Sequence, residues 1–382
     1  MNTSIIQRVA AAQPFDNEDQ EFWWKATGTT FNNLLQKAGY TPAQTEYHLT
    51  WYRRYVTASL GPRPIAGQKY PFTTGPVRDG SNVEFSINWK ESTKNARRIR
   101  FCIGAVDDKA GTTADPFGQY ETERILTRMQ GTHVPDLSLK RFKIFTDHLF
   151  IKKEDEAAAL AKIPSYIPRV TIWVAFDVQA QINAKVYFTL FNKVLETGIH
   201  PNQLLYNIAE DCDRQHGTAY DAGVATFKAY VDSFENPDHA PIGHLLSLDC
   251  ADGSDARIKT YVGSHARTLN EVKDLWTLGG RCYGPDVDAG IEALDQFWPI
   301  FFGLDPRAED LANIATIPEG MGLHTSVEFK SGSAMPELKL QFPVDTISAT
   351  DEELSHRLAS FFRLRGNAEY ADKFTADMKE SL

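Results

Sequence analysis

The chain has 382 residues, 42% of them hydrophobic, and a net charge of −10 at pH 7, which argues against nucleic acid as its main partner. This length allows either two ordinary domains or one large domain. No apolar run approaches a membrane span and the first residues lack a secretory signal, so we expect a cytoplasmic protein that does not bind membranes. The four cysteines are far apart without C-x-x-C spacing, which predicts buried free thiols and no metal site.

Two helices are predicted near the N-terminal end of the chain, within an opening segment of about 16–60. Apolar residues repeat at helical spacing over about 16–39, and Gly39 marks the end of this first helix. In the second, over about 41–60, Pro42 occupies a position that proline favours in the first turn.

Four pairs of strands are predicted after this segment, each flanked by helical patterns. They lie near 83–104, 170–189, 244–262 and 323–343. The unit helix–strand–strand–helix recurs at intervals of roughly 70 to 90 residues. Successive antiparallel hairpins can join edge to edge and close, with their apolar faces packed outward against helices. The predicted fold is therefore α+β, a single domain over 1–382 with an antiparallel β-barrel, a polar lumen and a ring of helices.

The strands of this pattern carry charged side chains on one face. In Ala256-Arg257-Ile258-Lys259-Thr260-Tyr261, the two cations and the tyrosine alternate with smaller or apolar residues and therefore share a face. Other strands pair side chains in the same way, namely Lys185 with Tyr187, Arg98 with Arg100, Glu84 with Ser86 and Asn88, and Lys339 with Gln341. One such strand is usually the solvent face of a sheet. Five of them favour a shared polar interior that binds an anion beside an apolar group.

Four stretches carry a resemblance to a known family. They are Asp79-Gly80-Ser81-Asn82-Val83-Glu84-Phe85-Ser86, Lys185-Val186-Tyr187, Ala256–Tyr261 and Trp276-Thr277-Leu278-Gly279-Gly280. Together they resemble the fungal aromatic prenyltransferases of the dimethylallyltryptophan synthase type, over about 22–364. The resemblance implies the same barrel and a reaction in which an allylic diphosphate ionises, an aromatic ring attacks the carbocation and a proton is lost.

The resemblance also implies that basic side chains hold the leaving diphosphate, so that no metal or other cofactor is needed. Arginine suits this role because its planar fork binds two phosphate oxygens at once. The implied diphosphate ligands are Arg100, Lys185, Arg257, Lys259 and Lys339. Arg98 has the same facing as Arg100, so the first position stays open between the two. Asp107-Asp108 has no further acid at helical spacing, and we interpret it as a solvated turn rather than a magnesium motif.

The remaining site residues are implied by the same resemblance. Tyr187 and Tyr261 match tyrosines that shield the carbocation, and Gln341 stands where the family usually has a third tyrosine. Glu84 matches the acid that accepts a hydrogen bond from the N–H or O–H of the acceptor. Trp173 stands where members that prenylate C4 of tryptophan have a lysine, so it is placed in the acceptor pocket and the deprotonating base is missing.

The C-terminal end departs from the family, which normally adds one more hairpin. Residues 367–382 predict a helix or a tail instead, so this end is atypical and shortened. Three alternatives stay open: the barrel closes with fewer strands, it pairs with a second copy in a homodimer, or it belongs to a shortened enzyme with altered activity. The leading hypothesis is metal-independent transfer of a prenyl group, dimethylallyl first, to an aromatic acceptor that contains indole. One alternative is another reaction on the same fold, such as cyclisation or rearrangement of a prenylated or polycyclic product, and a non-catalytic binding protein is a third reading.

Overall fold

The computed structural model describes most of the chain, which divides into two compact units. The described residues are 4–67, 81–88, 97–179, 181–253, 256–305, 317, 323–342, 344 and 349–381. The first unit comprises Met1–His200 and Ser247–Ala256, and the second comprises Pro201–Leu246 and Arg257–Glu380. The expectation of one domain over 1–382 stays a prediction.

The first unit opens with helices, two of which the sequence predicts. The helix predicted over 16–39 is α2, capped by Asn17, and the one predicted over 41–60 begins as α3 with a Thr41–Gln44 capping box. After α3 the chain continues with the wider hydrogen-bond pattern of a π-helix, η1, and a 3-10 turn, η2. The short helix α1 precedes them and is not predicted. The bounds are α1 Ile5–Ala11, α2 Glu18–Lys37, α3 Pro42–Trp51, η1 Tyr52–Val56 and η2 Thr57–Ser59.

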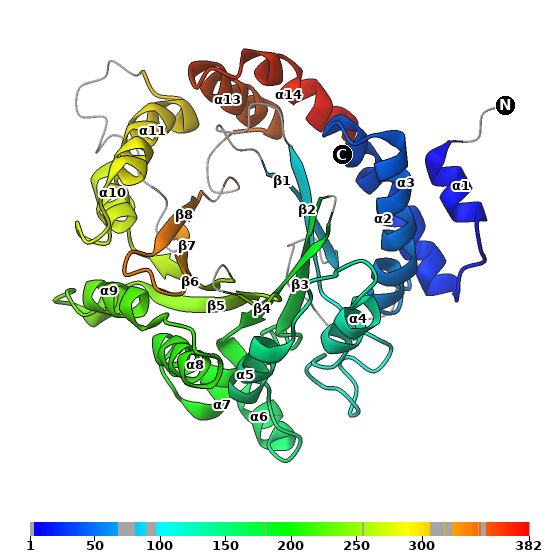
Figure 1. Ribbon diagram of the computed structural model, residues 1–382, viewed down its shortest axis with the longest axis horizontal. Coiled ribbons are helices and arrows are strands. Elements are labelled where there is room, and N and C mark those ends of the chain that lie inside the picture. The colour runs from blue at the N-terminus through cyan, green and yellow to red at the C-terminus, as the bar shows by residue number, and fades with distance from the viewer. Residues whose placement is uncertain are drawn as a thin grey trace. The chain divides into compact units, whose positions relative to one another are not determined.

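Four antiparallel strands of the first unit follow one another in chain order, as predicted. They are β1 Val83–Asn88, β2 Arg98–Ile103, β3 Ile172–Val178 and β4 Asn183–Thr189. One face packs on helices, because Phe31 of α2 lies 5.4 Å from Phe101 and Trp51 of α3 lies 5.0 Å from Phe176 between ring centroids. Figure 1 shows α2 and α3 along this side of the strands. Since neighbouring residues alternate between faces, the polar residues of β2 point to the other face.

Shorter helices of the first unit connect and follow these strands. They are α4 Glu121–Met129, α5 Lys140–Leu149, α6 Glu156–Lys162 and α7 Phe191–Thr197. Helical patterns over about 117–131 and 138–150 predict α4 and α5, whereas no such pattern predicts α6. The Asp107-Asp108 segment is a turn, as predicted, and the Asp107 carboxylate accepts a hydrogen bond from Lys109 N–H and pairs with Arg124.

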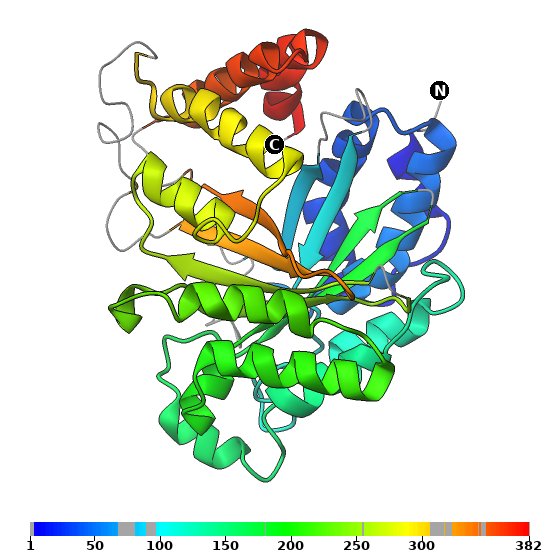
Figure 2. The same ribbon diagram turned by 60° about the vertical axis from the view of Figure 1, so that its left-hand side comes forward.

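The second unit repeats the same arrangement. Its strands are β5 Ile242–Asp249, β6 Ile258–Ser264, β7 Leu323–Phe329 and β8 Glu337–Gln341, again in chain order, although 247–249 of β5 are grouped with the first unit. Phe329 of β7 packs on Phe227 of α9 at 6.1 Å between centroids, and α10 lies beside β8 (Figure 2). The helices are α8 Pro201–His216, α9 Asp221–Val231, η4 Pro237–His239, α10 Leu269–Thr277, α11 Pro285–Phe302, α13 Asp351–Leu364 and α14 Ala368–Ser381.

The C-terminal segment, predicted as a helix or a tail, is the helix α14. Its aromatic residues pack on α13, with Tyr370 and Phe374 lying 5.0 and 5.2 Å from Phe362 between centroids. Among the described residues after Gln341, the regular elements are helices and no further strand occurs. Tyr370 thus has a packing role, and the expected pairing with a second copy stays a prediction.

The crossing of α10 and α11 depends on Gly290, which explains the tryptophan of the Trp276–Gly280 stretch. The Trp276 indole donates a hydrogen bond to the Val287 carbonyl at 3.0 Å. A Cβ atom at position 290 would lie 2.4 Å from Trp276 Cζ2. We therefore expect Gly290→Ala to lower the free energy of unfolding by about 1–3 kcal/mol, measured by urea denaturation, despite the better helix propensity of alanine.

The matched control for this prediction is Gly263→Ala in β6. A Cβ atom there meets nothing within 4 Å, so this variant should unfold at the wild-type urea concentration or slightly above it. Equal stability of both variants would contradict the close packing of Trp276 on Gly290.

Candidate active site

One face of the strands in the first unit collects the site residues predicted there. The register aligns Glu84 with Cys102, Cys102 with Ala175, and Ala175 with Lys185 across β1 to β4. Residues directly opposite each other in an antiparallel sheet point to the same face, so Glu84 and Lys185 share it. Asp79 and Gly80 of the motif before Glu84 lie outside the described residues.

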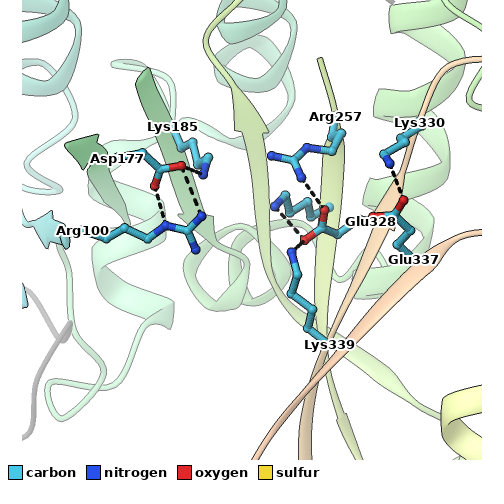
Figure 3. A network of polar contacts seen from close by, with 9 residues as sticks. Arg100, Asp177, Lys185, Arg257, Glu328, Lys330, Glu337 and Lys339 are labelled. Carbon is cyan, nitrogen blue, oxygen red and sulfur yellow. Dashed lines mark hydrogen bonds and ion pairs between the residues drawn. The ribbon is translucent and has the colours of Figure 1, made fainter. Parts of the chain in front are cut away.

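Arg100 and Lys185 lie on this face and share one carboxylate, that of Asp177. Lys185 Nζ donates to Asp177 Oδ2 at 2.6 Å, and Arg100 Nε lies 2.8 Å from Asp177 Oδ1 (Figure 3). We call these three residues the Asp177 cluster, which has a net charge of +1. Lys185 is only 6% exposed, and burial lowers its pKa although the charge of Asp177 opposes this shift. A buried cation requires such a partner.

The Asp177 cluster bears on the open choice between Arg98 and Arg100. Arg100 is directly opposite Asp177 in the register, whereas Arg98 is one row further, opposite Asn88. Arg98 lies near Tyr40, whose pKa is raised by burial while the charge of Arg98 opposes the shift. Of the two arginines, Arg100 is therefore the one that lies beside Lys185 in the Asp177 cluster.

Glu84, the predicted acid, faces solvent. It is at one end of the cross-strand row that continues through Cys102 and Ala175 to Lys185. Water reaches its carboxylate, but the protein atoms around it desolvate it in part and raise its pKa. Its cross-strand neighbour is Cys102, a free cysteine whose pKa is raised well above its usual value by burial and then by the charge of Glu84. The pair places a raised-pKa carboxylate on the same face as the Asp177 cluster.

Trp173 and Tyr187, predicted for the acceptor pocket and the carbocation shield, lie directly opposite each other on β3 and β4. Both side chains are half-buried. Cross-strand aromatic pairs of this kind provide a flat apolar surface beside polar groups. The register therefore brings the two predicted aromatic residues of the first unit together.

The second unit holds a larger basic cluster around Glu328 of β7. Arg257 Nη1 lies 2.8 Å from Glu328 Oε2, Lys259 Nζ lies 2.9 Å from Oε1, and Lys339 Nζ also donates to Oε1 (Figure 3). We call these four residues the Glu328 cluster, with a net charge of +2. Lys259 is 5% exposed and Glu328 1% exposed, whereas Lys339 extends into solvent. Burial would raise the pKa of Glu328, but the charges of Lys259 and Lys339 outweigh it and lower the pKa to about 2.

The same face of β6 to β8 carries the other predicted residues of this unit. Tyr261 is opposite Ser326, which is opposite Lys339, and Gly263 is opposite His324, which is opposite Gln341. Tyr261 is half-buried. The register thus places Tyr261 one row from Lys259 and Gln341 one row from Lys339, as the alternation predicts.

Sequence reasoning missed the two carboxylates that organise these clusters, as well as a pair formed by His244 and His324, the latter two rows from Glu328 on β7. His324 packs edge to face on His244, with 4.7 Å between ring centroids, and burial lowers the pKa of His244 to about 4. The signal for Asp177 was available, because Trp173, Ala175 and Asp177 alternate along β3. Glu328 alternates with Ser326 on β7 in the same way.

The described residues contain no group of three or more His, Cys, Asp or Glu side chains placed to hold a metal ion. None of their helices combines the length and apolar character needed to cross a membrane. All four cysteines are free, as predicted.

Comparison with known proteins identifies the family of the chain. The tryptophan dimethylallyltransferase family matches the chain over residues 19–377. The chain belongs to this family. It is therefore an aromatic prenyltransferase, as the sequence predicted.

Individual relatives align over most of the chain. The prenyltransferase iacE of Pestalotiopsis fici is 32% identical, covering 95% of this chain and 83% of its own length. The 7-dimethylallyltryptophan synthase hasE of Aspergillus fumigatus is 29% identical over 89% of this chain and 73% of its own length. The crystal structure of NotF in complex with brevianamide F and DMSPP has a TM-score of 0.83 at 21% identity, covering 99% and 90% of the two chains. This likeness confirms the predicted fold class of antiparallel strands covered by helices.

Proposed function

We propose that the protein transfers a prenyl group, dimethylallyl first, from its diphosphate to an aromatic acceptor that contains indole. The observation that carries this proposal is the Glu328 cluster. Its cations, Lys259 of β6, Lys339 of β8 and Arg257 directly before β6, meet at Glu328 close to the row of Tyr261. This arrangement provides an anion site beside an aromatic surface, as ionisation of an allylic diphosphate requires.

The basic residues supply the charge that such a reaction needs. As the C–O bond breaks, negative charge accumulates on the leaving diphosphate, and fixed cations stabilise it without reorganisation. Arg257 and Lys259 combine a planar fork with a compact ammonium group, and Lys339 completes the set. Because these cations can take the place of magnesium, we propose transfer without a metal. For Arg100 and Lys185 the same role stays a prediction, supported by the net charge of +1 of their own cluster.

The other predicted residues receive roles that their positions support. The π face of Tyr261 stabilises a cation and keeps water away from it, and Tyr187 has the same chemistry beside Trp173. Ionised Glu84 accepts a hydrogen bond from the acceptor N–H or O–H and raises the electron density of the ring. Gln341 contributes an amide where a third tyrosine is usual. The closed barrel with a polar lumen is part of this proposal.

The choice of donor and acceptor draws on the relatives. HasE is named as a dimethylallyltryptophan synthase, and NotF was crystallised with brevianamide F. Both names are consistent with the half-buried Trp173 and Tyr187 as an acceptor surface. The alternative of cyclisation or rearrangement requires no diphosphate, and the Glu328 cluster gives it no support.

The test is a transfer assay with purified protein, dimethylallyl diphosphate and a panel of acceptors. The panel contains tryptophan, an indole-containing cyclic dipeptide and a phenol, each in EDTA and in magnesium. We expect a prenylated indole product in EDTA, at a rate within about twofold of that in magnesium, because fixed cations stabilise the leaving group. Absence of product from every acceptor in both buffers would contradict the proposal, and product only with magnesium would contradict the metal-free part of it.

A further inference from the structure

A buried carboxylate lies at the centre of the proposed anion site, where an approaching diphosphate would be repelled by it. Glu328 is on β7, between β8, which carries Lys339, and β6, which carries Lys259 and begins directly after Arg257. Its Oε2 accepts from Arg257, and its Oε1 accepts from both Lys259 and Lys339. Both oxygens therefore bind the same side chains that are proposed to bind diphosphate.

The carboxylate of Glu328 compensates the mutual repulsion of the three cations. Three cations on one face repel each other, and Lys259 is nearly excluded from water. Glu328 draws all three toward one point and so fixes the positions of long side chains that would otherwise sample many rotamers. Once diphosphate is present, the same negative charge competes with it for the cations.

We propose that Glu328 is a resident counter-anion that holds Arg257, Lys259 and Lys339 in place. It also lowers their affinity for diphosphate, so that the product diphosphate dissociates faster. This inference rests on the proposed function, because it assumes that diphosphate binds to the Glu328 cluster. Glu328 acts through the cations and is a positioning residue. It remains negatively charged throughout the neutral pH range, since its pKa is about 2.

The same strand pair offers a matched control. Glu337 of β8 forms an ion pair with Lys330, and about half of the Glu337 side chain is exposed (Figure 3). Removing its charge changes the net charge of the protein by the same amount as removing that of Glu328. Glu337 is directly opposite Glu328 in the register of β7 and β8, but its ion pair is with Lys330 and it does not bind the cations of the Glu328 cluster. The comparison therefore separates the carboxylate inside the cluster from a neighbouring carboxylate.

The experiment is calorimetric titration of inorganic diphosphate, in EDTA, into wild type, Glu328→Gln and Glu337→Gln, at low and high salt. Removing the carboxylate raises the net charge of the cluster from +2 to +3, so Glu328→Gln should bind diphosphate at least about tenfold more tightly and with a steeper salt dependence. In turnover assays the same variant should show stronger product inhibition, with both kcat and KM lowered. Glu337→Gln should stay within about twofold of wild type.

If Glu328→Gln does not fold, the same substitution is tested in a chain that also carries Lys339→Gln. The double variant Glu328→Gln/Lys339→Gln has the wild-type cluster charge of +2, and it should bind diphosphate at least about tenfold more tightly than Lys339→Gln alone. Unchanged or weaker diphosphate binding on removal of Glu328, with binding to wild type intact, overturns this inference and leaves the proposed function standing. No binding to wild type or to any variant overturns both.

Discussion

Lys259→Ala is expected to weaken binding of a non-hydrolysable dimethylallyl diphosphate analogue by about 10- to 100-fold, the range of one lost charged hydrogen bond. Lys259 is the most buried cation of the Glu328 cluster, with 5% of its surface exposed, so water cannot substitute well for its ammonium group. Its loss also leaves the buried Glu328 carboxylate with less compensation. Calorimetric titration in EDTA measures the effect directly.

The control for this titration is Lys330→Ala. Lys330 forms an ion pair with Glu337, and about half of each side chain is exposed, so the same change of charge there should leave analogue binding within about twofold of wild type. Equal binding to wild type and to Lys259→Ala would show that the diphosphate does not contact β6. A loss of similar size in Lys330→Ala would indicate a general charge effect.

Glu84→Gln is expected to lower kcat by about 10²- to 10⁴-fold, the range for a general base that accepts a proton or a hydrogen bond from the reacting group in the transition state. Binding of the diphosphate analogue should not change, because the glutamine keeps the shape of the side chain. Desolvation raises the pKa of Glu84, and the role requires its ionised form. Activity of the wild type should therefore fall as the pH drops through a value above that of an ordinary glutamate.

The pH profile separates this role from a structural one. The fall of activity at low pH, the acidic limb of the profile, should be lost in Glu84→Gln. It should be retained in Glu123→Gln, whose exposed side chain lies on α4. An unchanged kcat in Glu84→Gln would remove Glu84 from the reaction. A lowered kcat with an unchanged acidic limb would place the titrating group elsewhere.

The long elements of the fold could be predicted from the sequence, because their periodicities are strong. The strand pairs predicted over 170–189 and 323–343 coincide with β3–β4 and β7–β8 to within two residues at their outer ends. The helices α1 and α6 were missed since each has seven residues, too few to show a helical repeat. In α1 only Val9 is buried, so the helix has no apolar stripe that a sequence pattern could show.

The candidate site was predicted only in part. The cations were identified because they alternate with apolar residues along single strands and because the family resemblance assigned them. Alternation along β3 and β7 also gives the facing of the two counter-anions, but it cannot show which cations they bind. Lys259 and Glu328 are 69 residues apart and meet only through the register of β6 and β7. The same holds for Trp173 and Tyr187, whose pairing depends on the register of β3 and β4.

The most direct test of the central claim is a crystal structure with the thio analogue of dimethylallyl diphosphate, grown in EDTA. The account predicts diphosphate oxygens within hydrogen-bond distance of Lys259 Nζ and the Arg257 guanidinium, with the prenyl group against the Tyr261 ring. A diphosphate group bound away from the Glu328 cluster would contradict it. So would binding that appears only after magnesium is added, with the ion between the diphosphate and protein carboxylates.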